Sequence, residues 1–191
     1  MDNSILENTQ FPYNIVTESS NEPLKIPQIN LARAKAATNQ LHLRASTIKP
    51  DVILVQEQYN NNNGIPGIPQ TWKTFSSSNQ AAILIPSSKL KPALLATKVN
   101  MVELKIQTSS FPITIISAYS SPAQNVHTTL QEIQEIISSL PDEKIIIGAD
   151  LNGHNTLWSY RSNDNRCKDI LDFILANNLN IINKPDALPT F

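Results

Sequence analysis

Residues 144–152 read Lys-Ile-Ile-Ile-Gly-Ala-Asp-Leu-Asn, a short apolar run that leads directly into two polar side chains. The three consecutive isoleucines do not alternate with polar residues, which predicts a strand over 144–148 that is buried on both faces. Asp150 and Asn152 follow just after this strand. A polar pair at the end of a buried strand is typical of a binding or catalytic site, so this stretch indicates both the fold class and a candidate site.

Strand and helix patterns alternate on either side of this stretch. Apolar residues at three- and four-residue spacing before Pro141 predict one clear helix at about 130–140. The predicted strands are 24–31, 51–57, 73–76, 81–86, 102–107, 113–119, 144–148 and 179–183, and the other predicted helices are 32–47 and 166–177. Pro27 cannot donate to a strand ladder, which predicts an edge position or a local break in the first strand. The alternation predicts a layered α/β domain.

The length and composition fit one domain. The chain has 191 residues, of which 40% are hydrophobic, and this is enough to bury a core. Residues 1–23 are rich in Asn, Ser, Glu and Thr, which predicts a disordered leader before a domain that spans 24–191. The chain has neither a signal peptide nor a run of about 20 apolar residues, so we expect an intracellular protein without a membrane partner.

The charge and the cysteine count exclude some classes of protein. Lys and Arg total 15 against 16 Asp and Glu, a net charge of -1. This is not the basic balance of a protein that holds nucleic acid by charge alone, so DNA contact would need a metal or other modules. The single cysteine, Cys167, excludes a disulfide framework and a thiolate zinc site. Its ordinary interpretation is a half-buried helix residue.

Polar residues at four predicted strand ends could share a site. They are Asn30, Glu57, Tyr119, and Asp150 together with Asn152. Taken singly, each has an ordinary structural interpretation. A Glu at a strand end is usually solvated, a Tyr is usually half-buried, and an Asp-x-Asn pair is usually a helix cap or an Asx turn. Asn30 alone carries little information.

Together and in this order, these residues resemble the endonuclease/exonuclease/phosphatase superfamily, which includes DNase I and the apurinic endonucleases. Four segments more closely resemble the endonucleases of arthropod non-LTR retrotransposons that insert into ribosomal or telomeric repeats. They are 28–31 (Gln-Ile-Asn-Leu) with 33–38, 56–59 (Gln-Glu-Gln-Tyr), 65–69 (Ile-Pro-Gly-Ile-Pro) and 148–158. The second and third segments are the specific part, because general phosphodiester chemistry does not need them.

The resemblance implies a DNase I-like α/β sandwich of two packed mixed or antiparallel sheets flanked by helices. It implies a Mg²⁺-dependent endonuclease that nicks target DNA by phosphodiester hydrolysis, with Mn²⁺ as an alternative cation. The expected partners are the DNA substrate and a reverse transcriptase downstream in the same polyprotein. The expected place of action is the nucleus.

The resemblance also assigns a role to each residue. Phosphodiester cleavage needs a cation beside the phosphate, an oriented water and a proton for the leaving oxygen. Mg²⁺ suits this reaction because it prefers oxygen ligands and retains several waters. The residue that matches Glu57 binds the metal, with support from Asn30. The residue that matches Asp150 orients or deprotonates the water, Asn152 steadies the phosphate, and Tyr119 hydrogen-bonds it.

The sequence departs from the family pattern in three places. Ala32 lies where magnesium enzymes of the superfamily often have a polar residue, and Cys167 lies where the retroelement pattern usually has Gly. The family's Ser/x-x-Ile-Asp-Leu strand and its Ser-Asp-His motif would both follow Phe191. The domain is therefore expected to be incomplete at its C terminus.

The histidines and the missing motifs leave alternatives open. His154 matches a family loop residue near the site and is a candidate accessory residue, whereas His42 and His127 are expected to be structural or solvated. The main alternative function is an inactive relic or a non-catalytic binding fragment of the same family. A phosphatase acting on inositol phosphates or lipids would need a basic pocket or motifs that the sequence does not contain.

Overall fold

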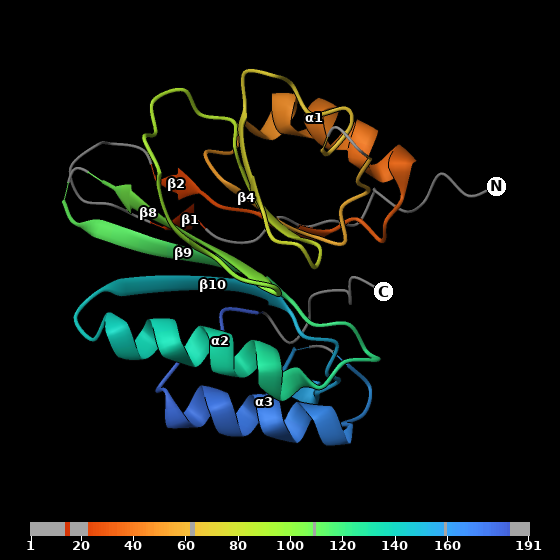
Figure 1. Cartoon of the computed structure of the whole chain (residues 1–191), viewed down its shortest axis with the longest axis vertical. Helices are drawn as coiled ribbons and strands as arrows, with labels where there is room; N and C mark the ends of the chain where they lie inside the picture. Colours follow the sequence, from red (N-terminus) through yellow and green to blue (C-terminus); the bar gives the residue numbers. More distant parts are fainter. Residues whose placement is uncertain (1–13, 16–22, 62–63, 109, 159, 184–191) are drawn as a thin grey trace.

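Two four-stranded sheets pack face to face in the computed structural model, which describes residues 14–15, 23–61, 64–108, 110–158 and 160–183. Figure 1 shows α1 on the outer side of one sheet, with α2 and α3 beyond the other. The predicted layered α/β sandwich with mixed sheets is therefore confirmed.

The first sheet contains the N-terminal half of the fold. Its strand order is β3 (Gln28–Asn30), β4 (Ile53–Gln56), β6 (Ala81–Ile85) and β5 (Lys73–Ser76). β3 and β4 are parallel and are joined by α1 (Lys35–Ile48), whereas the other two pairs are antiparallel. α1 begins later than the predicted start at residue 32, because Ala32 and Arg33 adopt left-handed backbone conformations with φ of 48° and 55°.

The second sheet repeats this plan. Its strand order is β10 (Lys144–Asp150), β9 (Pro112–Tyr119), β8 (Met101–Gln107) and β7 (Ala93–Thr97). β9 and β10 are parallel and are joined by α2 (Val126–Ser139), and α3 (Asn165–Ala176) packs against α2. The side chains of Asn125 and Asp164 cap the starts of α2 and α3 by accepting hydrogen bonds from backbone N–H groups.

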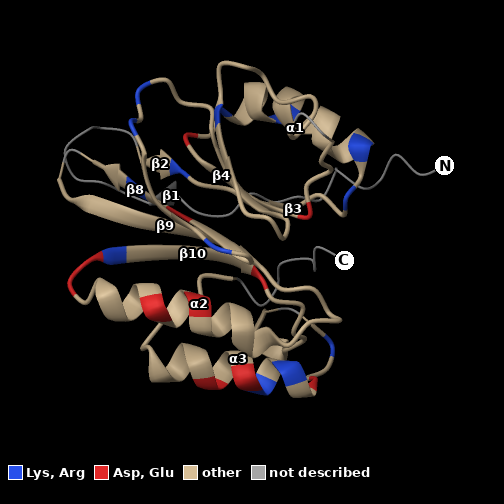
Figure 2. Ribbon diagram, in the orientation of Figure 1, with Lys and Arg blue, Asp and Glu red and all other residues tan. Residues whose placement is uncertain are grey.

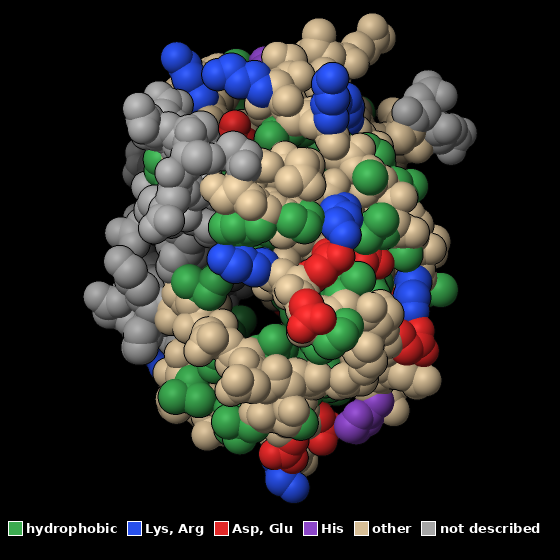
Figure 3. Space-filling model, turned by 90° about the vertical axis from the view of Figure 1, so that its left-hand side faces the viewer, with side chains coloured by type: hydrophobic (Ala, Val, Ile, Leu, Met, Phe, Trp, Pro, Cys, Tyr) green, Lys and Arg blue, Asp and Glu red, His purple; other side chains and the backbone are tan. Residues whose placement is uncertain are grey.

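The main core lies between the two sheets, where alternate residues of each strand face inward. Its buried members are Ile26, Val52, Leu54, Ile83, Ile85, Val102, Leu104, Ile106, Ile113 and Ile115. Outward-facing residues of the first sheet pack with α1, and those of the second sheet pack with α2. Figure 3 looks onto the end of the sheets where β10 begins, and charged side chains of both signs lie there among hydrophobic ones.

Several elements differ from the predictions. β10 is half-buried rather than fully buried, because it has a neighbouring strand on only one side among the described residues. β7 was not expected from its Ala-Leu-Leu-Ala-Thr sequence, and it forms by pairing with β8. The predicted strand at 179–183 is wrong, because no described strand pairs with these residues; Ile181 and Ile182 are 37% and 50% exposed.

The N-terminal region departs from the simple prediction of one strand after a leader. The predicted strand at 24–31 is interrupted before Gln28, so that Leu24–Lys25 forms β2 and Pro27 lies in the break. Asn14–Ile15 forms β1 and pairs antiparallel with β2. Residues 1–13 and 16–22 of the predicted leader lie outside the described residues, so the division into leader and domain stays a prediction. No helix in the described part of the chain is long and apolar enough to cross a membrane.

Candidate active site

Three of the predicted site residues form one hydrogen-bonded cluster at the ends of three strands. The Asn30 side-chain amide nitrogen, at the end of β3, lies 3.2 Å from Glu57 Oε2 and 2.5 Å from Asp150 Oδ2. Glu57 directly follows β4, and Asp150 ends β10. Because one nitrogen contacts both carboxylates, their oxygens can be no farther apart than about two hydrogen-bond lengths. The two sheets therefore bring these residues into one site.

Tyr119 joins the same cluster from the end of β9. Its hydroxyl donates a hydrogen bond to Glu57 Oε1 at 2.7 Å, and its side chain is almost fully buried. Burial raises the pKa of Tyr119, and the hydrogen bond to Glu57 and the charge of that carboxylate raise it further. The hydroxyl therefore remains a hydrogen-bond donor at neutral pH.

The environment of Asp150 raises its pKa above the ordinary Asp value. Burial is the main cause that raises the pKa of Asp150, and the charge of Glu57 adds to it. Hydrogen bonds from Asn30 and from the Asn152 backbone, together with the positive charge of Arg166, oppose this rise without cancelling it. A carboxylate with a raised pKa is better suited to accept a proton from a nearby water than an ordinary surface Asp.

Asn152 is held beside Asp150 by a tight turn. Its backbone N–H donates to Asp150 Oδ1 at 3.1 Å, and its φ is 52°, a left-handed conformation that Asn tolerates better than most residues. Its side-chain amide donates to the Ser120 carbonyl at 3.0 Å. The Asx turn considered for the Asp-x-Asn pair is thus present, and Asp150 uses its other oxygen for Asn30.

His154 lies on the connection after β10 and contacts other residues of that connection. Its ring stacks on Tyr160 with 4.2 Å between ring centroids, and its Nδ1 lies 3.9 Å from Asp164 Oδ2. Its backbone N–H also donates to Asp164. The structure therefore places its ring against Tyr160 rather than within the hydrogen-bonded carboxylate cluster.

A buried polar network beneath the cluster was not expected from the sequence. Gln56 is fully buried, and its amide donates to Ser117 Oγ at 3.0 Å and to the Gly148 carbonyl at 3.1 Å. Gln28 donates to Gln56 Oε1 at 3.2 Å and to the Ala149 carbonyl at 3.1 Å. These amides connect the two sheets directly below the carboxylates. The sequence feature that could have indicated this network was a Gln at the end of the apolar strand β4.

Gly148 allows the two sheets to approach each other at this point. A Cβ atom there would lie 2.3 Å from Leu54 Cδ1 and 3.2 Å from Gln28 Oε1. Any larger residue would push β10 away from β4 or displace these side chains. The Gly in the Ile-Gly-Ala-Asp stretch therefore sets the distance between the strands that carry Glu57 and Asp150.

Arg166 joins the two connections that flank Asp150. Its guanidinium donates to the Leu151 carbonyl at 2.5 Å, to the Gln124 carbonyl at 2.6 Å and to Ser120 Oγ at 2.6 Å. Asn152 donates to the carbonyl of the same Ser120. Arg166 thus fixes the β10–α3 connection against the β9–α2 connection, a role that depends on tertiary contacts and leaves no sequence pattern.

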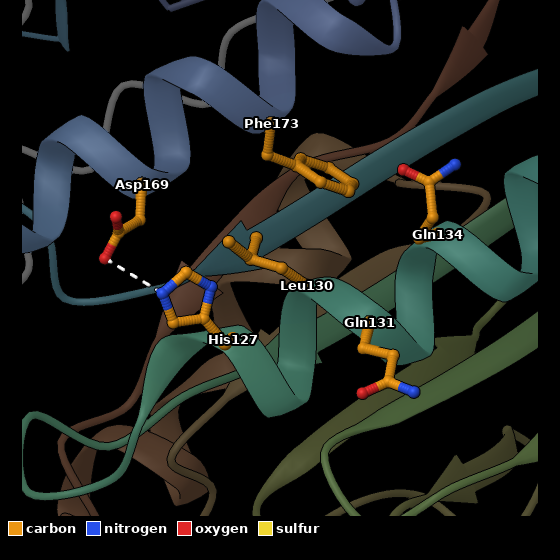
Figure 4. Close-up of a pocket in the computed structure, with 6 residues that line it drawn as sticks. All are labelled: His127, Leu130, Gln131, Gln134, Asp169 and Phe173. Atoms are coloured by element: carbon orange, nitrogen blue, oxygen red, sulfur yellow. Dashed lines mark ion pairs between the residues drawn. The ribbon is translucent and has the colours of Figure 1, made fainter.

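A separate groove lies between α2 and α3. Figure 4 shows its lining, and its volume is about 370 Å³. His127 forms an ion pair of 3.3 Å with Asp169 across it, in agreement with a structural role for this histidine. None of the candidate site residues lines this groove, so it is distinct from the carboxylate cluster.

The donor atoms of the cluster fit a hard divalent cation. Glu57 and Asp150 supply oxygen atoms side by side, and Mg²⁺ typically binds one or two carboxylates together with waters and a phosphate. Among the described residues, no group of three or more His, Cys, Asp or Glu side chains is placed to hold a metal. Asn30 directs its amide nitrogen at the carboxylates, while its Oδ1 accepts from the Ala32 backbone N–H at 2.7 Å. Asn30 therefore orients the carboxylates in this arrangement.

Comparisons with known proteins agree with this fold. Residues 113–191 match the family model described as "Endonuclease-reverse transcriptase". The structure is similar to the endonuclease domain of TRAS1, a telomere-specific non-LTR retrotransposon, with a TM-score of 0.77 and 27% identity over 87% of this chain and 75% of that chain. The family-model match covers less than half of the chain, so these comparisons show a fold similar to that of a retrotransposon endonuclease.

Structures with lower sequence identity share only the fold with this chain. A humanized D. rerio TDP2 has a TM-score of 0.50 and 12% identity, over 69% of this chain and 63% of that chain. The beta toxin of Staphylococcus aureus has a TM-score of 0.52 and 15% identity, over 78% and 70% of the two chains. No curated protein sequence matches the chain at a significant level.

Proposed function

We propose that this domain is a Mg²⁺-dependent endonuclease of a non-LTR retrotransposon, which nicks target DNA by hydrolysing a phosphodiester bond. The observation that carries the proposal is the Asn30 amide shared by Glu57 and Asp150, with Tyr119 donating to Glu57. This cluster lies in a fold similar to that of a retrotransposon endonuclease. The same site would accept Mn²⁺ in place of Mg²⁺, because both bind oxygen ligands.

Each residue of the cluster has a separate task in the proposed reaction. Glu57, oriented by Asn30 and Tyr119, would hold the cation, which neutralises charge on the phosphate when it is bound. Asp150 would orient a water toward the phosphorus and accept its proton, which its raised pKa favours. The Asn152 amide would steady a phosphate oxygen, and the Tyr119 hydroxyl would turn its hydrogen bond from Glu57 to the phosphate when substrate binds. His154 remains a candidate accessory residue at the rim.

The biological setting follows from the family. Its description joins an endonuclease with a reverse transcriptase, and the most extensive structural similarity described above is to a retrotransposon domain. The expected partners are therefore the target DNA and a reverse transcriptase of the same polyprotein. Nicking of chromosomal DNA would take place in the nucleus.

The two carboxylates should respond differently to substitution. Asp150→Ala is expected to lower the nicking rate by about 10² to 10⁴ with little change in DNA affinity, because it removes only the water-orienting group. Glu57→Gln is expected to raise the Mg²⁺ concentration required for half-maximal rate by about tenfold, because it removes one negative oxygen from the cation site. Supercoiled plasmid nicking over a Mg²⁺ series measures both effects.

A matched control separates these effects from a general change in acidity. Asp172→Asn alters an exposed acidic residue on α3 and should nick at the wild-type rate. Equal and mild effects of the two site variants would contradict the mechanism. A wild-type chain that is folded by circular dichroism and binds DNA, yet never nicks it with Mg²⁺ or Mn²⁺, would support the non-catalytic alternative.

A further inference from the structure

Arg33 lies at the edge of the carboxylate cluster, on the short connection between β3 and α1. Residues 31–34 read Leu-Ala-Arg-Ala, so Arg33 is the only charged or polar side chain of this connection. Its backbone N–H donates to the Glu57 carbonyl at 2.7 Å, and the Leu31 N–H donates to the Gln56 carbonyl at 2.8 Å. These bonds fix the connection on the end of β4.

The backbone of this connection is strained. Ala32 and Arg33 have φ of 48° and 55°, and Glu57 has φ of 50°. Non-glycine residues in the left-handed region usually cost about 1 kcal/mol or more, and such strain gathers at functional sites. The backbone hydrogen bonds to Glu57 and Gln56 therefore hold this connection in an unfavourable conformation. That conformation places Arg33 beside the carboxylates.

The Arg33 guanidinium is anchored on its inner side. Nε donates to Gln80 Oε1 at 2.8 Å and lies 3.3 Å from Glu57 Oε1. Among the described residues, neither Nη1 nor Nη2 forms a hydrogen bond to a carboxylate, carbonyl or amide oxygen, and 56% of the side chain is exposed. The side chain also forms a hydrogen bond with the Tyr119 hydroxyl, and this bond and the charge of Arg33 oppose the rise in the pKa of Tyr119. The outer edge of the guanidinium is therefore oriented and open to solvent.

We propose that Arg33 binds a phosphate of the DNA through Nη1 and Nη2, next to the bond that is cleaved. The inference rests on the proposed function and adds a substrate-binding residue to its site. A guanidinium offers two parallel N–H donors that match two phosphate oxygens, and anchoring through Nε reduces the side-chain entropy lost on binding. Its charge also offsets the repulsion between the phosphate and the Glu57 and Asp150 carboxylates.

Three further observations favour a ligand over a purely structural role. Tyr119 and Asn30 already hold Glu57 by hydrogen bonds, so Glu57 does not need Arg33 for its orientation. An ion pair whose Arg is more than half exposed also contributes little to stability. The neighbouring helix α1 begins with Lys35 and carries no acidic residue, so positive charge continues beyond Arg33 at the start of this helix (Figure 2).

The test measures DNA binding over a series of salt concentrations in EDTA, with the full chain and a short fluorescent duplex. The variants are Arg33→Met and Arg33→Lys, with Arg44→Met as a matched control on α1. Arg33→Met should raise Kd about tenfold and reduce the slope of log Kd against log salt by about 0.9, because one phosphate contact is lost. Arg33→Lys should retain the slope and raise Kd severalfold, because it keeps the charge but loses the two-pronged geometry. Arg44→Met should bind as the wild type does.

Nicking assays with Mg²⁺ then separate Arg33 from Glu57. If the proposal holds, Arg33→Met lowers kcat/KM about 10-fold to 100-fold without changing the Mg²⁺ concentration for half-maximal rate. The proposal would be overturned if Arg33→Met kept the wild-type salt slope and required as much Mg²⁺ as Glu57→Gln does. Arg33 would then serve only to orient Glu57. If the wild-type chain binds DNA but does not nick it, the proposed function is wrong, while the phosphate contact of Arg33 can still be measured by DNA binding. A wild-type chain that binds DNA neither in EDTA nor in Mg²⁺ overturns the inference itself.

Discussion

The two ends of the interface between the sheets are built from different chemistry. Inward-facing positions at the far end are filled by branched apolar side chains, and those at the site end by polar or small ones. On each of three strands, every second residue faces inward and forms a row that runs toward the site. In chain order the rows are Val52, Leu54 and Gln56 on and beside β4; Ile113, Ile115, Ser117 and Tyr119 on β9; and Ile146, Gly148 and Asp150 on β10. Each row therefore changes from apolar to polar toward the site.

The two ends therefore contribute differently: one to the stability of the fold, and the other to the orientation of the site residues. Burying the apolar ends removes hydrocarbon from water, which is the dominant favourable term in folding. Buried amides and hydroxyls contribute little net free energy but cost much if they are left unpaired, so they specify one arrangement. We infer that the apolar end keeps the sheets together and that the polar end determines how Glu57 and Asp150 face each other.

The largest expected effect is a loss of stability at the apolar end. Ile115 is fully buried, and Ile115→Ala should lower the free energy of unfolding by about 2–5 kcal/mol, because it removes apolar contact and leaves a cavity. Chemical denaturation measures the change. The folded fraction should nick DNA within about threefold of the wild-type rate. Lost activity with unchanged stability would show that the two ends are not separable in this way.

A substitution at the polar end should lower activity more than it lowers stability. Gln56→Leu removes the amide that joins Ser117 and the Gly148 carbonyl across the sheets. We expect the nicking rate to fall by about 10², because displacement of a catalytic group by about 1 Å can cost that much. The free energy of unfolding should change by only about 1–3 kcal/mol, since leucine restores part of the lost burial while one carbonyl is left unpaired. Wild-type activity in this variant would contradict an orienting role.

The smallest predicted effect is a gain in stability within the site. Because burial raises the pKa of Asp150, its contribution to the stability of the metal-free chain is fully present below the ordinary Asp pKa and is lost as pH rises through the raised value. Asp150→Asn removes this dependence and should raise Tm at pH 7 in EDTA by roughly 2–4 °C. Thermal scans at several pH values test this, and an equal gain at low pH would exclude the electrostatic cause.

Most of the fold could be predicted because its signals are local. The apolar spacing on α2 and the run of β-branched and aromatic residues on β9 predict these elements regardless of their neighbours. β7 and the region after α3 depend on whether another strand lies alongside them, which no local pattern contains. The late start of α1 likewise results from the left-handed conformations of Ala32 and Arg33, which are stabilised by contacts with the end of β4.

The candidate site was predictable for residues that follow strands and not for those that act through tertiary contacts. Asp150 and Glu57 were found because they follow predicted strands and, together and in order with the other polar residues, resemble a known superfamily. Arg33 and Arg166 were not, because an Arg near a helix start has the same sequence signature whether it is solvated or bound to distant carbonyls. Gln56 lay within a recognised motif, but its role between the sheets required the position of Gly148 on the other sheet.

The late position of β10 in the sequence affects when the site can form during synthesis and folding. Asn30 and Asp150 are 120 residues apart in sequence, so their contact closes a very long loop and forms slowly compared with local helices. During synthesis, Asn30, Glu57 and Tyr119 emerge from the ribosome well before β10 does. The nascent chain therefore lacks a complete pair of carboxylates until the second sheet has assembled, and the order of translation itself delays the appearance of any nuclease activity.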